Sequence, residues 1–140
     1  MVEHPNEALV RRVYAAFNAG DFDTMRELFA PDVIWNVAGN SRISGEHRGQ
    51  DSVFQLFTLV GELTGGNLKL EPRTIEAQGD DTVLATHRVW AKRNGNELDV
   101  VETENITIRE GKVTRFDETV DDQRATDEFW GLADRAGLRA

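Results

Sequence analysis

The chain has no cysteine among its 140 residues, and this absence excludes disulfide bonds and thiol chemistry. Basic residues are also scarce: 16 lysines and arginines stand against 25 acidic residues, and the net charge is −9. A nucleic-acid groove or an anionic membrane surface is bound through clustered basic side chains. We therefore expect neither nucleic acid nor membrane as a partner.

Long apolar runs are missing as well. The longest mostly apolar stretch, residues 53–60, is far too short to span a bilayer, and the first seven residues lack the basic and apolar regions of a signal peptide. A cytoplasmic protein is the expectation. Its length, with 39% hydrophobic and 29% charged residues, is typical of one soluble domain, here residues 1–140.

Apolar side chains recur at helical spacing in the first half of the chain, which predicts three helices. Their expected caps and ends are Asn6, Gly20, Asp21, Pro31, Gln50 or Asp51, and Gly65-Gly66. Between the second and third helices we expect a short strand at residues 32–37 and a polar loop at 38–49.

From residue 68 the apolar period becomes two, which indicates strands at residues 68–78, 82–93, 97–109 and 112–120. Asn94-Gly95 predicts a hairpin because both residues tolerate positive φ. Asp121 or Asp122 caps a last helix with an apolar side formed by Ala125, Phe129, Leu132 and Ala133. Helices followed by a meander predict an α+β fold, with helices on one face of a mainly antiparallel sheet.

Alternation along the last three strands gathers four ionisable side chains on an apolar face, which are His87, Glu102, Glu104 and Glu118. Acids on such a face are costly unless they are hydrogen-bonded or used in function. Val101 falls on the polar face, and a bulge there could shift the alternation on either side of it. A reversed alternation in the last strand would make Asp117, instead of Glu118, the inward acid.

An apolar cup raises the pKa of a carboxylic acid, and a second carboxylate nearby raises one of the two pKa values further. We therefore predict Glu104 and Glu118 as a catalytic acid and base. His87 would assist them, and Asn36 would orient a carbonyl or a water. Purely structural alternatives stay open: Glu102 could be a solvated surface acid, His87 a core or rim histidine, and Asn36 an amide that hydrogen-bonds to loop backbone.

The expected substrate-binding walls are Tyr14, Phe17, Trp35, Phe54, Phe57, Val89, Ile106 and Phe116. Trp35 and Trp130 suit a core as well as a pocket wall. His47, in a glycine-rich loop, is expected to be exposed unless that loop covers the pocket mouth.

The sequence predicts no metal and no cofactor. His87 with two or three glutamates is a permissible ligand set. However, the chain has no His-x-His or His-Glu-x-x-His spacing, no glycine-rich phosphate loop and no nucleophile elbow.

Five short strings occur in a familiar order: Asn18-Ala19-Gly20-Asp21, Leu28-Phe29-Ala30-Pro31-Asp32, Trp35-Asn36-Val37, Gly45-Glu46-His47-Arg48-Gly49 and Gly111-Lys112-Val113. With the order of elements over residues 6–130, they resemble the nuclear transport factor 2-like superfamily, and more narrowly its SnoaL-like and ketosteroid-isomerase-related branch. The resemblance implies a cone-shaped curved sheet, with N-terminal helices closing an apolar pocket that holds few polar groups. It also implies a homodimer, for which the sheet face around Trp90 is a candidate surface.

The ketosteroid-isomerase pattern transfers only in part. Its base falls at Asn36, an amide that cannot abstract a proton, and its tyrosine donor falls at Val13, one residue before Tyr14. Its protonated acid falls at Glu104. Steroid isomerisation is therefore not predicted.

The pattern of the limonene-type epoxide hydrolases also transfers in part. Their second-strand arginine and aspartate fall near Ala85 and His87, so the arginine is missing here. Their last-strand aspartate falls on Glu118. SnoaL-like cyclases are similar at the level of the fold.

Two classes of function remain open after these comparisons of residues. The first is an isomerase, cyclase or hydrolase that acts on a small hydrophobic molecule through pocket carboxylates. The second is a non-catalytic domain on the same scaffold that binds a small ligand or another protein.

Overall fold

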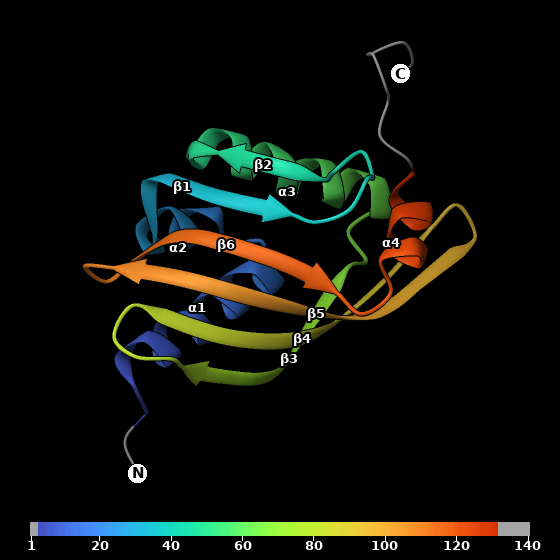
Figure 1. The fold of residues 1–140 in the computed structure, drawn as a ribbon. Helices are drawn as coiled ribbons and strands as arrows, with labels where there is room; N and C mark the ends of the chain where they lie inside the picture. The colour runs from blue at the N-terminus through green and yellow to red at the C-terminus, as the bar shows by residue number, and fades with distance from the viewer. Residues whose placement is uncertain (1–2, 132–140) are drawn as a thin grey trace.

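The computed structural model describes residues 3–131, which form a curved six-stranded sheet and four helices (Figure 1). The elements are α1 (Pro5–Ala19), α2 (Phe22–Leu28), β1 (Phe29–Val37), β2 (Gly45–Arg48), α3 (Gly49–Thr64), β3 (Lys69–Ala77), β4 (Thr82–Arg93), β5 (Asn96–Arg109), β6 (Lys112–Val120) and α4 (Gln123–Trp130). Helices α1, α2 and α3 cover one face of the sheet, and α4 lies at one end of it. The expected α+β architecture is confirmed.

The strand order is β2-β1-β6-β5-β4-β3. Every neighbouring pair is antiparallel except β1 and β6, which run parallel and place Val37 opposite Glu118. This pairing joins the strand that follows the first two helices to the last strand of the meander. The apolar face of the sheet therefore combines residues from both halves of the chain.

Local chemistry explains most of the helix ends. Helix α1 is capped by His4, and not by Asn6 as the sequence suggested: the His4 ring accepts a hydrogen bond from the Asn6 amide, and Glu7 accepts one from the His4 amide. This capping box, followed by Pro5 at the first helical position, satisfies amides that would otherwise lack partners. Gly20 ends α1 at φ 67°, as predicted.

The second helix ends before Pro31, because β1 begins at Phe29. Pro31 lies where the pairing of β1 with β6 shifts register, between Phe29 and Ile34. A proline has no amide hydrogen to donate and is tolerated at such an irregularity.

Residues 45–48 are a strand, although the sequence predicted a loop throughout residues 38–49. This edge strand is short and polar, so it carries no apolar alternation. Its pairing with β1 defines it, with His47 opposite Trp35.

The predicted bounds of β4 and β6 are confirmed. Asn94 and Gly95 adopt φ of 52° and 80°, so the predicted hairpin is confirmed. Asp122 caps α4, while Leu132 and Ala133 lie outside the described residues. No helix within residues 3–131 combines the length and the apolar character that a membrane crossing requires.

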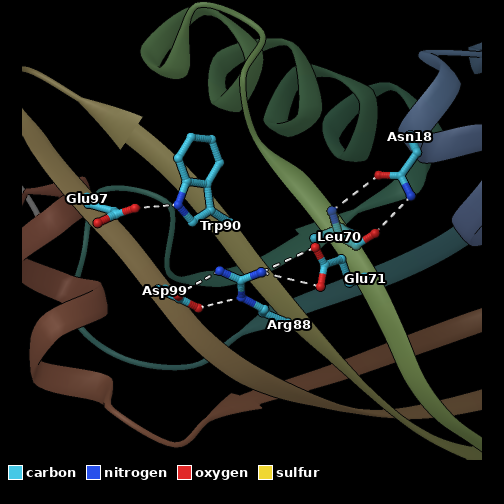
Figure 2. Close-up of polar contacts among 7 residues, drawn as sticks. All are labelled: Asn18, Leu70, Glu71, Arg88, Trp90, Glu97 and Asp99. Carbon is cyan, nitrogen blue, oxygen red and sulfur yellow. Dashed lines mark hydrogen bonds and ion pairs between the residues drawn. The ribbon is translucent and has the colours of Figure 1, made fainter.

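The outer face of the sheet carries a polar network (Figure 2). Arg88 makes a two-pronged contact with Asp99, with both N–O distances at 2.7 Å, and also reaches Glu71. Trp90 donates to Glu97 on the same face. Arg88 and Trp90 point to this outer face. Because adjacent strand residues point to opposite faces, the intervening side chains of β4 point toward the helices.

Candidate active site

Burial alternates along β5 in the predicted sense. Glu102 is 9% exposed, Glu104 2%, and Ile106 1%. The pairing of β4 with β5 is continuous past Val101, so no bulge reverses the parity there. The structure therefore places both glutamates among apolar side chains, and the surface reading of Glu102 is wrong.

His87 joins helix α1 to the sheet at the centre of the site. Its Nδ1 lies 2.7 Å from the Tyr14 hydroxyl, and its Nε2 lies 2.7 Å from Oε1 of Glu102. The histidine is 1% exposed and the tyrosine 6%. Both ring nitrogens are therefore engaged within the protein.

Burial decides the protonation of Tyr14 and His87 in this hydrogen-bonded group. It raises the pKa of the Tyr14 phenol, which keeps its proton, and it lowers the pKa of His87 to about 4, so the imidazole is neutral at neutral pH. When Glu102 is ionised it can only accept, so Nε2 donates its ring hydrogen to Glu102, and the phenol donates to the unprotonated Nδ1.

Glu104 has the least favourable surroundings in the site. Both of its carboxyl oxygens are buried, and within residues 3–131 no backbone amide, hydroxyl or basic side chain donates a hydrogen bond to them, so the neighbouring Glu118 carboxyl is their polar contact. Burial first, and then the neighbouring Glu118 carboxylate, raises the pKa of Glu104 well above its ordinary value. This shift favours the neutral, protonated form of Glu104, which has a proton to donate.

Burial also raises the pKa of Glu102 to about 7, and the pKa of Glu118 rises in the same direction. Glu118 lies on the same face of β6 as the buried Phe116, as predicted, and remains partly exposed. The ion pairs of residues 3–131 give these three glutamates no lysine or arginine partner. The site thus holds carboxyl groups that titrate near neutrality.

These side chains also have the composition of a metal site. His87, Glu102, Glu104 and Glu118 each offer one donor atom, and these atoms lie within 4.8 Å of one another. An ion bound to His87 Nε2 would have to displace its hydrogen bond to Glu102. The hydrogen-bonded arrangement fits proton transfer better than metal coordination.

Two small cavities flank the carboxyl cluster. One has a volume of about 20 Å³ and is lined by Tyr14, His87 and Glu104, while the other has about 60 Å³ and is lined by Glu102 and Glu118. The predicted walls at the first cavity are Tyr14, Phe17, Trp35, Phe57, Ile106 and Phe116, and Val89 lines the second. The enclosed space is small because Trp35 stacks on Phe116 at 3.8 Å.

Phe54 lines neither inner cavity, contrary to the sequence prediction. Its ring stacks on Phe22 at 5.2 Å, and the Arg26 guanidinium lies 4.6 Å from the ring centre. A spacing of three residues rotates Phe54 by about 60° from Phe57 around α3, which turns it toward α2.

Asn36 is also separated from the carboxyl cluster. Its amide donates to Asp117 over 3.1 Å, and Asp117 in turn binds Arg115. Its neighbours Trp35 and Val37 line the inner cavities, so strand alternation turns Asn36 to the other face. The same alternation removes Asp117 from the list of inward acids.

The hydrogen bond from Tyr14 to His87 was not expected from the sequence, although the helical spacing of Val10, Val13, Tyr14 and Phe17 places Tyr14 on the inward side of α1. Trp130, from α4, lines the larger cavity, as its pocket-wall reading allowed. The ring of His47 contacts the Ile43 carbonyl at 2.8 Å and is partly buried.

Residues 10–116 match the family model of the SnoaL-like domain. An uncharacterised protein of Mycobacterium tuberculosis is 33% identical over 130 residues, which cover 93% of this chain and 99% of that protein.

Solved structures give the same picture. Bal32a, from a soil-derived mobile gene cassette, has a TM-score of 0.88 at 38% identity and covers 91% of this chain and 97% of its own. TerC, co-crystallised with polyporic acid, has a TM-score of 0.79 at 25% identity, covering 90% and 98%. Further structures with this fold are described as cystatin-like and NTF2-like.

Proposed function

Since the chain belongs to the SnoaL-like domain family, on the nuclear transport factor 2-like scaffold, we propose that it is an enzyme that moves protons on a small apolar molecule. The observation that carries this proposal is Glu104, a buried acid that receives no hydrogen bond from an amide, hydroxyl or basic side chain of residues 3–131 and lies beside two other carboxyl groups. The reaction class is that of an isomerase, a cyclase or a hydrolase. The proposal concerns catalysis, since family membership by itself fixes only the scaffold.

The proposed step is paired acid and base catalysis. For a ketone, Glu104 donates its proton to the carbonyl oxygen while ionised Glu118 takes a proton from the adjacent carbon. For an epoxide, Glu104 donates its proton to the oxygen as the C–O bond breaks, Glu118 takes a proton from the water that bonds to the carbon, and a proton then returns from Glu118 to Glu104. For a ketone, the reverse transfers at a different carbon give an isomer and restore both glutamates. The Tyr14–His87 contact would hold the neutral imidazole against Glu102, and so position that third carboxyl.

The likeness to TerC supports a pocket that admits organic molecules. That relative was crystallised with polyporic acid, which makes this compound a reasonable first ligand to test on the present chain.

Glu104→Gln and Glu118→Gln test the proposal. Wild-type protein should accelerate deuterium incorporation into apolar ketones, or the opening of apolar epoxides, and each variant should lose at least about 100-fold of that rate. Their melting temperatures should stay similar or rise, because a neutral amide replaces a poorly solvated carboxyl. NMR in heavy water and differential scanning calorimetry give the two readouts.

Asp117→Asn is the matched control, because Asp117 neighbours Glu118 but faces the outer side with Arg115. It should keep wild-type turnover. Equal rates in the wild type and both glutamine variants, or no rate above buffer for either class of compound, would overturn the proposal.

A second function is favoured by the small inner cavities of about 20 and 60 Å³. A cup so nearly filled leaves little room for a reacting molecule, and a non-catalytic domain that binds a ligand or another protein tolerates it. Under this alternative, a ligand saturates the protein and is recovered unchanged.

A further inference from the structure

A larger groove lies outside the inner cavities. It has a volume of about 400 Å³ and is lined by the end of α1, by Phe22, by the second half of α3 and by residues 66 and 68. Phe17 and Phe57 line this groove and both inner cavities. Val60 and Leu68 are shared between the groove and the larger cavity. The groove is therefore separated from the carboxyl cluster only by side chains.

Size shows that the inner cavities are incomplete as a ligand site. Pockets for small molecules usually measure about 300–1,000 Å³, several times the volume inside this cup. The outer groove falls within that range. Phe17 and Phe57 meet edge to face at 5.1 Å between the two spaces, and Phe17 is the less buried of the pair. A molecule that reaches the carboxyl groups would extend past these rings into the groove.

Gly61 is an independent sign that the groove is kept open. It lies inside α3 and lines the groove, where a glycine costs about 1 kcal/mol relative to alanine. Its φ is not positive, and a Cβ at this position would meet no atom within 4 Å. Neither the backbone nor the packing of the described residues calls for glycine here. A side chain at Gly61 would instead project into the open space.

The groove offers no charge to a ligand. Its polar side chains already have partners: Asn18 bonds to the backbone of Leu70 (Figure 2), Thr58 donates to the Phe54 carbonyl, and Thr64 donates to the Val60 carbonyl. No charged side chain among the described residues lines it. An uncharged, mainly apolar occupant matches this surface.

We propose that the groove binds the outer part of the same ligand whose inner end lies at the carboxyl cluster. The ligand class is an uncharged, elongated, mainly apolar molecule, and Phe17 and Phe57 contact its middle. The inference rests on the proposed function only for the reactive inner end. The volume of the groove, the walls that it shares with the inner cavities and the glycine at position 61 support ligand binding in the groove whatever the reaction.

Titration of the full chain with the neutral fluorophore Nile red tests the groove. Wild-type protein should bind one molecule per chain with enhanced emission. Gly61→Leu should weaken binding by about tenfold or more, since its side chain occupies the groove. Gly61→Met, with another side chain that favours helix, is the second blocking variant. Both variants should retain the wild-type circular dichroism spectrum and melt no lower than wild type.

Two controls separate blocking from general damage. Gly61→Ala adds only a methyl group and should keep the affinity, as should Glu62→Leu, which places a leucine on the neighbouring exposed position outside the groove. Wild-type affinity in both blocking variants, or failure of the wild type to bind the probe, overturns the inference.

Glu104→Gln distinguishes the two proposals. It should bind Nile red as the wild type does while losing turnover. Full turnover in that variant would sink the acid and base mechanism and leave the groove standing, whereas unimpaired binding by Gly61→Leu would do the reverse.

Discussion

At the scale of single residues, His87 has the most consequential contacts. It is buried between a phenol from α1 and a carboxyl from β5, and both of its nitrogens are used. A buried imidazole with two partners has a defined tautomer, which ionised Glu102 fixes by accepting from Nε2 and the Tyr14 hydroxyl supports by donating to Nδ1. Tyr14 therefore acts on the carboxyl cluster through the histidine rather than by touching a ligand's reactive group.

Tyr14→Phe should expose this dependence. Removal of the hydroxyl leaves His87 Nδ1 buried without a partner, so the free energy of unfolding should fall by about 1–3 kcal/mol. Nitrogen NMR should detect a mixed tautomer in place of a single one, and urea titration measures the stability. A single unchanged tautomer together with wild-type stability would contradict the assignment of the Tyr14–His87 hydrogen bond.

The sequence predicted the inward residues of the strands better than those outside them. Glu104 and His87 followed from alternation, because a strand has only two faces. Asn36 did not, since the resemblance placed it near the site while its own strand turned it toward Asp117. The prediction that Phe54 lines the inner pocket was wrong for a related reason. The apolar stripe of a helix is broad, and one turn of α3 faces both the cup and α2.

At the scale of elements, the bounds that could be predicted from the sequence were those marked by turn residues. The bounds of β4 and β6 were readable because alternation ends at turns with glycine, at Gly95 and Gly111. The short strand β2 was not readable, since its four residues are defined by a neighbour distant in sequence. The cap at His4 was missed because histidine is an uncommon cap residue.

Two glycines give a paired prediction at this scale. Gly61 and Gly95 both have open space where a Cβ would lie, but Gly95 has φ of 80° and Gly61 is helical. Gly61→Ala should raise the free energy of unfolding by about 0.5–1 kcal/mol, through helix propensity. Gly95→Ala should lower it by about 1–2 kcal/mol, because alanine disfavours the left-handed region. Urea titrations check both, and equal signs for the two variants would contradict the explanation.

At the scale of the whole molecule, an acidic chain with a net charge of −9 encloses three carboxyl groups. The ordinary pKa of 4.5 for Glu102 rises to about 7 in the folded state, so the stability that it contributes is complete below 4.5 and is lost as the pH rises through 7. Glu104 and Glu118 act in the same direction. His87 acts oppositely: its pKa falls from 6.5 to about 4, so stability is lost as the pH falls through that window.

Three glutamates outweigh one histidine, so the protein should be more stable at about pH 5.5 than at about pH 8, by on the order of a few kcal/mol. Urea titrations at a series of pH values measure the difference. Glu118→Gln should flatten the profile, and Asp117→Asn should change it far less, because Asp117 is the smallest of the causes that raise the pKa of Glu104. Stability that rises steadily between these two pH values in the wild type would refute the proposed protonation of the cluster.

Association into a homodimer stays a prediction, which sedimentation analysis would check.

The parallel pairing of β1 with β6 has a consequence for synthesis on the ribosome. Residues 29–37 lie beside residues 112–120, so the two strands can pair only after residues 112–120 have left the exit tunnel. Until then the aromatic side of β1, with Phe29 and Trp35, lacks the strand that covers its edge. Long-range pairing of this kind slows folding and leaves nascent chains prone to stick to one another. The chamber is therefore completed only once β6 has emerged, and a message truncated before β6 would yield an aggregating fragment instead of a smaller working protein.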